Sequence, residues 1–222
     1  MLDIIASIYD GEDDDKFRIR ITSDKTNNDI FKLSDIAELT NDTNRNLMNN
    51  VYIDMFELDS DGNEIAKAFE SELMLFYDIY DVKTILDIAD ANCADALEYI
   101  EKLLESDEYN RDLSDYDYDE ILMTWGKNIV SGALHRFYVY PEYRKLGIGK
   151  TMINSLDKLL EMALNLKLRC LVTYPKPDDG QSDNMLEIMI KNIVNNGFRP
   201  LFESDSHYIR DYIDEYFDYM EN

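Results

Sequence analysis

The stretch RKLGIGKT, residues 144–151, places two glycines and a lysine directly before a run of apolar residues at helical spacing. A glycine turn that leads into a helix is a common way to hold a phosphate, because backbone N–H groups and the positive end of the helix dipole both point at the anion. The stretch therefore predicts a phosphate-binding turn. An ordinary turn that only packs a strand against a helix is the alternative.

The residues on either side of the turn predict a strand before it and a helix after it. The segment ALHRFYVY, 133–140, is rich in β-branched and aromatic residues and stops at Pro141, which is typical of a strand. After Lys150 the apolar residues recur every three or four positions, as in an amphipathic helix: Met152, Leu156, Leu159, Ala163 and Leu166. The turn thus connects a strand to a helix.

A nucleotide-binding P-loop is one motif that ends in glycine, lysine and threonine. Its pattern GxxxxGK[ST] requires a further glycine at the position where this sequence has Arg144. The next strand, LRCLVTY at 168–174, runs into Pro175 and does not end in the aspartate that would hold magnesium. We therefore do not expect a nucleoside triphosphate site here.

A coenzyme A site fits the stretch better. The pattern V-x-P-x-x-R-x-x-G-x-G is formed by Val139, Pro141, Arg144, Gly147 and Gly149. In this pattern the sequence resembles the GNAT superfamily of N-acetyltransferases, whose signature consists of a strand, this loop and a helix. The resemblance implies an enzyme that transfers an acetyl group from acetyl-CoA, its co-substrate, to a primary amine.

The resemblance also implies which residues bind acetyl-CoA. Glycines let the backbone approach the pyrophosphate, and neighbouring N–H groups and cationic side chains balance its charge. The implied cofactor-binding residues are Phe137, Tyr138, Val139, Arg144, Lys145, Leu146, Gly147, Ile148, Gly149, Lys150 and Thr151.

The fold that the resemblance implies is an α/β fold: a GNAT-like mixed, strongly twisted sheet flanked by helices. We expect residues 1–222 to form a single acetyltransferase-like domain. The sequence departs from the family in two places. Residues 77–120 predict an inserted helical and acidic segment before the signature strand, and Ile193 stands where the family often has a tyrosine as general acid.

Hydrophobic periodicity and turn residues predict the remaining elements of the chain. In chain order, we expect a strand at 17–23, a helix at 31–42, a hairpin across 51–76 that turns at Asp61-Gly62, a helix at 90–104, a loop at 105–120, a strand at 168–174, a helix at 185–193 ended by Asn196-Gly197, a strand at 198–204 and a helix around 209–217. In the helix at 90–104, the spacing places these residues on one face: Cys93, Leu97, Ile100 and Leu104.

Acetyl transfer to an amine needs a base that takes a proton from the amine and an acid that gives one to the thiolate. Glu70 and Glu72, on one strand of the predicted hairpin, are the candidates for the base, and both are also explained as solvent-facing strand residues. The candidates for the acid are Tyr174 and Tyr208. A backbone N–H at the end of HRFYV, 135–139, would stabilise the oxyanion.

The composition is strongly acidic, with 22 Lys and Arg against 47 Asp and Glu, a formal net charge of −25. Such a chain repels nucleic-acid phosphates, so we expect no nucleic-acid partner. It attracts cations, which favours a cationic acceptor: a polyamine, an aminoglycoside or a Lys-rich protein. An acidic surface that serves only solubility is the alternative. Residues 136–150 carry a net +3, a local basic region suited to an anionic ligand.

A second class of function stays open, a non-enzymatic acidic protein. An excess of carboxylates can mimic a DNA surface and bind the basic groove of a partner on a degenerate acetyltransferase fold. The missing tyrosine at Ile193 and the net −28 outside residues 136–150 favour this alternative, whereas the intact glycine loop favours the enzyme. Affinity for coenzyme A separates the two.

Other features bear on location and ligands. No apolar run reaches the ~18 residues of a membrane span, and the acidic N-terminus lacks the basic start of a secretory signal, so we expect a cytoplasmic protein without membrane association. Cys93 and Cys170 are interpreted as reduced, buried thiols. His135 and His207 lack the spacing of a metal site, so we expect none, and His135 is interpreted as structural. The oligomeric state stays open, a homodimer included.

Overall fold

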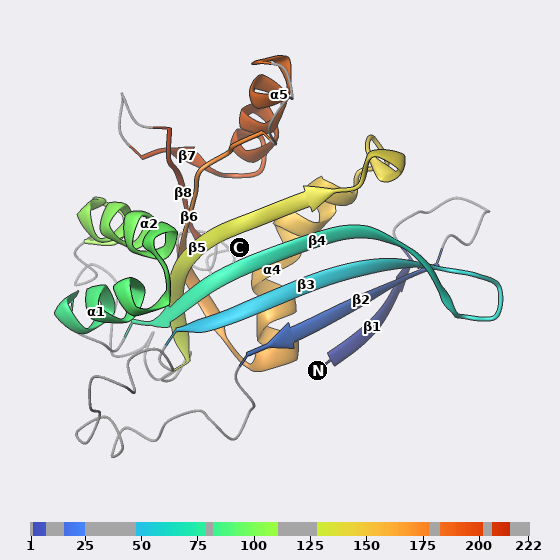
Figure 1. Ribbon diagram of the computed structural model, residues 1–222, viewed down its shortest axis with the longest axis horizontal. Coiled ribbons are helices and arrows are strands. Elements are labelled where there is room, and N and C mark those ends of the chain that lie inside the picture. The colour runs from blue at the N-terminus through green and yellow to red at the C-terminus, as the bar shows by residue number, and fades with distance from the viewer. Residues whose placement is uncertain are drawn as a thin grey trace, which may run out of the picture.

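The computed structural model describes residues 2–7, 16–24, 48–78, 82–110, 128–177, 183–201 and 206–213. Within them, strands form one sheet in the order β1-β2-β3-β4-β5-β6-β8-β7, with helices on both faces (Figure 1). The strands are β1 (Leu2–Ser7), β2 (Lys16–Ser23), β3 (Asn49–Leu58), β4 (Glu64–Tyr77), β5 (Ile129–Val139), β6 (Lys167–Thr173), β7 (Arg199–Pro200) and β8 (Tyr208–Asp211). The helices are α1 (Val82–Asn92), α2 (Ala94–Glu105), α4 (Ile148–Leu164), α5 (Asp183–Val194) and the short 3-10 helix η4 (Pro141–Tyr143). None of the described helices is long and apolar enough to span a membrane.

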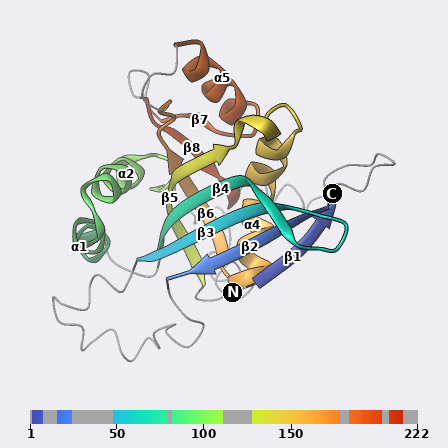
Figure 2. The ribbon, with the colours of Figure 1, turned by 45° about the vertical axis from the view of Figure 1, so that its right-hand side comes forward.

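The sheet is mixed and strongly twisted, as the resemblance implies. Neighbouring strands are antiparallel throughout, except that β5 and β6 run parallel. A parallel pair needs a crossover connection, and α4 provides it between β5 and β6. Figures 1 and 2 show how the strands change direction across the sheet from β1 to β6. The predicted fold class is confirmed.

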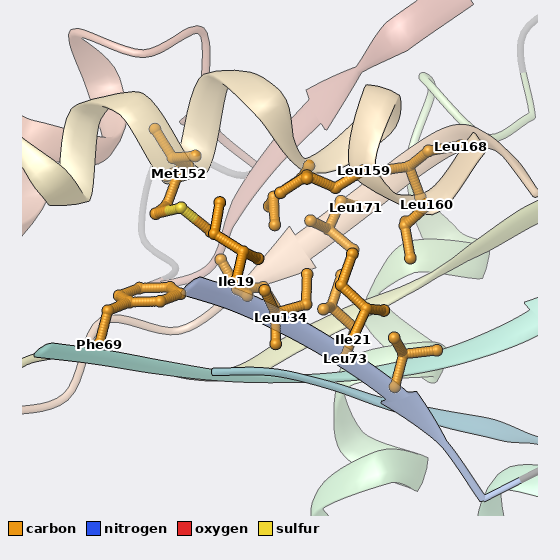
Figure 3. Packing of buried hydrophobic residues seen from close by; sticks show 14 of the residues in the cluster. Ile19, Ile21, Phe69, Leu73, Leu134, Met152, Leu159, Leu160, Leu168 and Leu171 are labelled. Atoms are coloured by element: carbon orange, nitrogen blue, oxygen red, sulfur yellow. The ribbon is translucent and has the colours of Figure 1, made fainter. Parts of the chain in front are cut away.

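One face of the sheet packs against α4. Because the side chains of a strand alternate between faces, Phe69 and Leu73 of β4 both point to this face, where they are fully buried. Met152 and Leu159 of α4 pack in the same cluster, which also includes Leu134 of β5 (Figure 3). The amphipathic helix predicted after Lys150 is therefore confirmed.

The opposite face packs against α1 and α2 at one end of the sheet (Figure 1). Met74 and Phe76 of β4 point to this face and meet Ile88 of α1 and Ile100 of α2. The described part of the segment predicted as helical and acidic is thus largely helical, and it covers sheet surface. That this segment is an insertion into a family fold remains a prediction.

The helix expected at 90–104 differs from the prediction at Cys93. The chain breaks there into α1 and α2, because Cys93 has extended backbone angles and caps α2: its Sγ accepts the N–H of Ala96 at 3.3 Å. Cys93 is exposed, so the prediction that both thiols are buried is wrong for this residue. Cys170 is buried, and burial raises the pKa of its thiol. Of the residues expected on the buried face, α2 buries Ile100, and the rest of that face is made by Ala96, Tyr99 and Leu103.

The C-terminal prediction is wrong in part. Residues predicted to start a helix form strand β8, because Ile209 pairs with Val172 of β6 and is fully buried there. Of the strand expected at 198–204, Arg199–Pro200 form β7, and residues 202–204 lie outside the described residues. The hairpin turn at Asp61-Gly62 and the helix end at Asn196-Gly197 are confirmed, since both glycines have positive φ, 82° and 89°. The helix predicted at 31–42 lies outside the described residues, as does most of the expected loop.

Candidate active site

The loop that contains the glycines joins β5 to α4. After β5, η4 makes one tight turn, and two residues then adopt left-handed backbone angles, Lys145 with φ 68° and Gly147 with φ 81°. A Cβ on Gly147 would meet nothing within 4 Å, so the glycine is required there for its backbone angles and not for space. This turn brings the chain directly into the first residue of α4, Ile148.

The backbone N–H groups at the start of α4 have no partner within the helix. Thr151 is the first residue whose N–H bonds within the helix, to the carbonyl of Gly147 at 3.0 Å. The N–H groups of residues 145–150 make no backbone hydrogen bond to any described residue. A row of free donors at a helix N-terminus, with the positive end of the helix dipole behind it, forms a binding site for an anion.

The start of α4 lies close against β5 at Gly149. A Cβ on Gly149 would come within 3.4 Å of Cγ2 of Val139 and 3.6 Å of Cε1 of Phe137. Contacts at 3.4 Å are at the tight end of ordinary packing, and a branched side chain would extend further into the same two residues. Gly149 therefore holds the loop near the end of β5.

The three cations of the loop differ in their roles. Arg144 is half-buried: its Nε donates to the carbonyl of Val139 at 3.1 Å, and its guanidinium lies 5.5 Å from the ring centre of Tyr138. Arg144 thus ties the loop to β5. Lys145 and Lys150 are exposed beside the free N–H groups, where their charge is available to an anionic ligand.

Strands β5 and β6 separate before β5 reaches this loop (Figure 1). Their last paired residues are Leu134 and Thr173, so residues 135–139 of β5 have no β6 partner. At the same place β5 carries a bulge: Leu134 pairs with Leu73 of β4 and Arg136 pairs with Glu72, which leaves His135 as the extra residue. The separation exposes one backbone edge of β5 next to the glycine loop.

The two candidate bases lie on β4, opposite this part of β5. Glu70 is held by three partners: it forms ion pairs with Arg136 and Lys67, and it accepts the hydroxyl proton of Tyr140 at 3.2 Å. Its carboxylate is therefore occupied by cations, which disfavours a role as proton acceptor.

Glu72 lies opposite Tyr52 of β3 on one side and opposite Arg136 of β5 on the other. The pKa of Tyr52 is raised, first by burial and then by the negative charge of Glu72. Glu72 thus faces a phenol and a guanidinium on the face that α2 covers further along the sheet.

The two candidate acids lie on opposite faces of the sheet. Tyr174 directly follows β6, is 38% exposed, and stacks on His207 with ring centres 5.1 Å apart. Tyr208 packs instead against the cluster under α4. Tyr174 follows Thr173, the last β6 residue paired to β5, and Tyr208 of β8 pairs with Thr173. The side chains of the two tyrosines nevertheless do not come together.

Two residues that the sequence did not single out as chemical groups, Tyr99 and Glu98, lie beside the histidines. Tyr99 of α2 meets the rings of both histidines edge-on, at 6.0 Å from His135 and 5.8 Å from His207. Oε1 of Glu98 lies 3.8 Å from Nε2 of His207. These residues come from separate segments, and no local spacing in the sequence connects them. Among the described residues, no group of His, Cys, Asp and Glu could hold a metal ion.

Known structures with a likeness to this chain include acetyltransferases. The crystal structure of AtaTR bound with AcCoA is 12% identical, with a TM-score of 0.40 over 90% of this chain and 98% of that one. AtaT complexed with acetyl-methionyl-tRNAfMet is 12% identical, with a TM-score of 0.35 over 90% and 99%. A GNAT-family acetyltransferase from Listeria monocytogenes is 15% identical, with a TM-score of 0.31 over 87% and 92%.

Identities and TM-scores this low do not assign a family, an activity or an acceptor. No protein-family model and no curated protein matches the sequence. The loop and the separation of β5 and β6 are therefore the features that bear on function.

Proposed function

We propose that the protein binds acetyl-CoA at residues 144–151 and transfers the acetyl group to a primary amine. One observation carries the proposal: the free N–H groups of residues 145–150 lie at the start of α4, directly after the part of β5, residues 135–139, that has no β6 partner. A pyrophosphate needs several donors that converge on it, and this loop offers them together with Lys145 and Lys150.

The separated part of β5 suits the rest of the cofactor. Residues 135–139 pair with β4 on one side and have no β6 partner on the other. The pantetheine arm of acetyl-CoA contains amide groups, which can hydrogen-bond to an open strand edge as another strand would. A cofactor with its pyrophosphate on the loop would thus extend along β5 toward His135, with the thioester at the strand separation.

The chemistry needs three groups at that point. A backbone N–H of β5 near the bulge would stabilise the oxyanion that forms as the amine attacks the thioester carbonyl. Tyr174, at the end of β6, would supply a proton to the leaving thiolate, and it suits this role better than Tyr208, which packs under α4. The third group is the base that takes the proton of the amine. Of the two candidate carboxylates, Glu72 is the one proposed, because Glu70 is already bound in ion pairs with two cations.

The acceptor we propose is cationic: a polyamine, an aminoglycoside or a Lys-rich protein. The net charge of −25 attracts such molecules over distances set by the ionic strength. AtaT is seen with an aminoacyl-tRNA, and a tRNA acceptor is the alternative for the present chain. Repulsion between phosphates and this acidic surface favours the cationic amine.

Calorimetry with acetyl-CoA tests the proposal directly. We expect binding to the wild type, and a melting temperature that rises with acetyl-CoA concentration, because the ligand binds only the folded state. ATP at the same concentration serves as the control for a generic phosphate site and should bind at least about tenfold more weakly, a difference of about 1.4 kcal/mol. Absence of binding at millimolar acetyl-CoA would reject the function and leave the acidic binding protein as the better interpretation.

A further inference from the structure

The turn that precedes the glycine loop is fixed to the β3–β4 hairpin at its start. A register shift between Met55 and Phe56 of β3 leaves Ala68 of β4 as an extra residue, a bulge. The carbonyl oxygen of Ala68 accepts the N–H of Tyr140 at 3.1 Å, where β5 has ended and η4 is about to begin. The hairpin thus holds the first part of the turn through backbone atoms.

The last residue of the turn, Tyr143, is fixed to the same hairpin by its side chain. The hydroxyl of Tyr143 donates to Oε2 of Glu57, near the end of β3, and so joins segments 86 residues apart. Glu57 lies opposite Phe17 of β2, and the ring of Tyr143 meets the ring of Phe17 edge-on, with the ring centres 6.2 Å apart. The ring of Tyr143 is half-buried against the cluster under α4, while its hydroxyl reaches a carboxylate.

Tyr143 acts only as a donor in this bond. Its pKa is raised to about 12, first by burial and then by the hydrogen bond to Glu57 and the negative charge of that carboxylate. The phenol therefore keeps its proton at neutral pH. A hydrogen bond to a charged acceptor is stronger than one between neutral groups, so this contact restrains the turn more than an ordinary surface hydrogen bond does.

The free N–H groups of the loop depend on this turn for their position. Residues 145–150 donate no backbone N–H to any described residue, so their place is set by the turn before them and by the start of α4 after them. On the side of the turn, Arg144 donates from Nε to the carbonyl of Val139 at 3.1 Å, and Tyr143 is the residue before it. Donors that converge on one anion need such support from the residues behind them.

We infer that Tyr143 is a positioning residue for acetyl-CoA, and that its hydrogen bond to Glu57 holds residues 145–150 in the geometry that binds the pyrophosphate. The inference rests on the proposed function, because it concerns the affinity of the same loop. Apparent affinity falls in proportion to the fraction of molecules whose site has the binding geometry. Loss of the hydrogen bond lowers that fraction, so the dissociation constant for acetyl-CoA rises although the loop sequence is unchanged.

The expected effect of Glu57 is opposite to what its charge alone predicts. A carboxylate near an anion site repels the ligand, so removal of the charge would by itself strengthen binding. The inference predicts weaker binding instead, because the Glu57 carboxylate is the acceptor that holds the turn. Glu142 is the matched comparison, since it is an exposed carboxylate of the same turn. Its replacement by alanine should leave the affinity for acetyl-CoA equal or higher.

Calorimetry with acetyl-CoA tests the role of the hydroxyl. Tyr143→Phe removes the hydroxyl and keeps the ring, and it should raise the dissociation constant about tenfold, which corresponds to about 1.4 kcal/mol. Tyr140→Phe is the matched control: it removes a hydroxyl of the same turn, which donates to Glu70 at 3.2 Å. It should change the dissociation constant less than about twofold, because the backbone bond from Tyr140 to Ala68 remains.

The acceptor is tested in the same way. Glu57→Ala should raise the dissociation constant about tenfold, whereas Glu57→Gln should stay within about threefold of the wild type, because the amide oxygen still accepts the hydroxyl proton. The double variant with Tyr143→Phe and Glu57→Ala should bind no more weakly than either single variant, since all three lack the same bond. Urea unfolding verifies that each variant is folded at the temperature of the titration. If Glu57→Ala does not fold, Tyr143→Phe and Glu57→Gln carry the test.

The outcomes separate the inference from the proposed function. If the wild type binds acetyl-CoA and Tyr143→Phe binds it within about twofold as well, the inference is overturned and the proposed function stands. Additive losses in the double variant, or tighter binding by Glu57→Ala, also overturn the inference alone. If the wild type does not bind acetyl-CoA, the proposed function fails and the inference with it.

Discussion

Asp78 and Arg169 form a buried ion pair at the end of the sheet opposite the glycine loop. Nη1 of Arg169 lies 3.5 Å from Oδ2 of Asp78, and the two side chains are 9% and 4% exposed. The hydroxyl of Ser131 donates to the same carboxylate oxygen at 3.1 Å, and Nη2 of Arg169 donates to the carbonyl of Tyr109 at 2.6 Å. The pair therefore connects the end of β4, the start of β5, β6 and the segment after α2.

The first prediction concerns the pH dependence of stability. Burial raises the pKa of Asp78 to about 6, although Arg169 and Ser131 lower it, while an unfolded aspartate titrates near 3.8. Between these values the folded state holds a proton that the unfolded state has lost, so the contribution of Asp78 to the free energy of unfolding is full below pH 4 and is lost as the pH rises through 6.

Urea unfolding at several pH values checks this sign. The free energy of unfolding of the wild type minus that of Asp78→Asn should fall between about pH 4 and pH 6, by a few kcal/mol at most. Above pH 6 the difference should be constant. Asp78→Asn provides the reference because asparagine does not titrate. A difference that rises with pH in this range would show that Arg169 lowers the pKa of Asp78 by more than burial raises it.

The second prediction concerns the two loop glycines. Gly147→Val forces a branched residue to adopt a left-handed backbone, at a cost of roughly 1–3 kcal/mol, and Gly149→Val pushes α4 away from Val139. Both variants should lose acetyl-CoA binding in calorimetry while remaining folded. Gly62→Val is the matched control: φ is 82° and a Cβ would meet nothing within 4 Å, but Gly62 lies at the β3–β4 turn. It should lose similar stability and keep full affinity for acetyl-CoA.

The third prediction concerns Gly132 of β5. A Cβ on this residue would lie 2.0 Å from the carbonyl oxygen of Met74 and 2.9 Å from Cα of Leu75, both backbone atoms of β4. Backbone cannot move aside as a flexible side chain can, so Gly132→Ala should destabilise the protein by about 3 kcal/mol or more in urea unfolding. Gly62→Ala should have a smaller effect. Equal stability of Gly132→Ala and the wild type would contradict the close approach of the two strands.

The fourth prediction concerns salt and the acceptor. If the acidic surface attracts a cationic acceptor, kcat/KM with spermidine should fall about tenfold or more from low to high salt, because the screening length is ~10 Å at 0.1 M. A zwitterionic amino acid of similar size is the control and should show a flat dependence. Neutral or anionic amines as the best substrates, or a flat dependence for spermidine, would leave the acidic surface with a role in solubility alone.

Local patterns in the sequence predicted the part of the fold around the loop. The β5 strand, α4 and β6 each have an apolar periodicity that fits one element, and Pro141 and Pro175 mark strand ends. Strand β8 was missed because the apolar residues around 209–217 have a helical spacing. The first of them form a strand instead, because they pair with β6, a segment far away in the sequence. The break at Cys93 was missed because a cysteine is an uncommon helix cap, and a single continuous period suggested one helix.

The candidate site was predictable only where its residues are consecutive. The cofactor loop occupies one stretch, so its glycines and cations could be named from spacing. The group formed by His135, Tyr99, His207 and Tyr174 comes from four segments that only the fold brings together. His135 was interpreted as structural, and nothing in the sequence shows that its ring contacts Tyr99 of α2.

The order of the strands has a consequence for how the protein folds. From β1 to β6, each strand pairs with the one before it in the chain, so these pairs can form as the chain is synthesised, and contacts between near neighbours form fastest. Strand β8 is the exception, since it inserts between β6 and β7, and its Arg210 donates from Nη1 to the carbonyl of Ile153 in α4 at 3.1 Å. The half of the molecule proposed to hold acetyl-CoA can therefore be completed only after β8 has been synthesised.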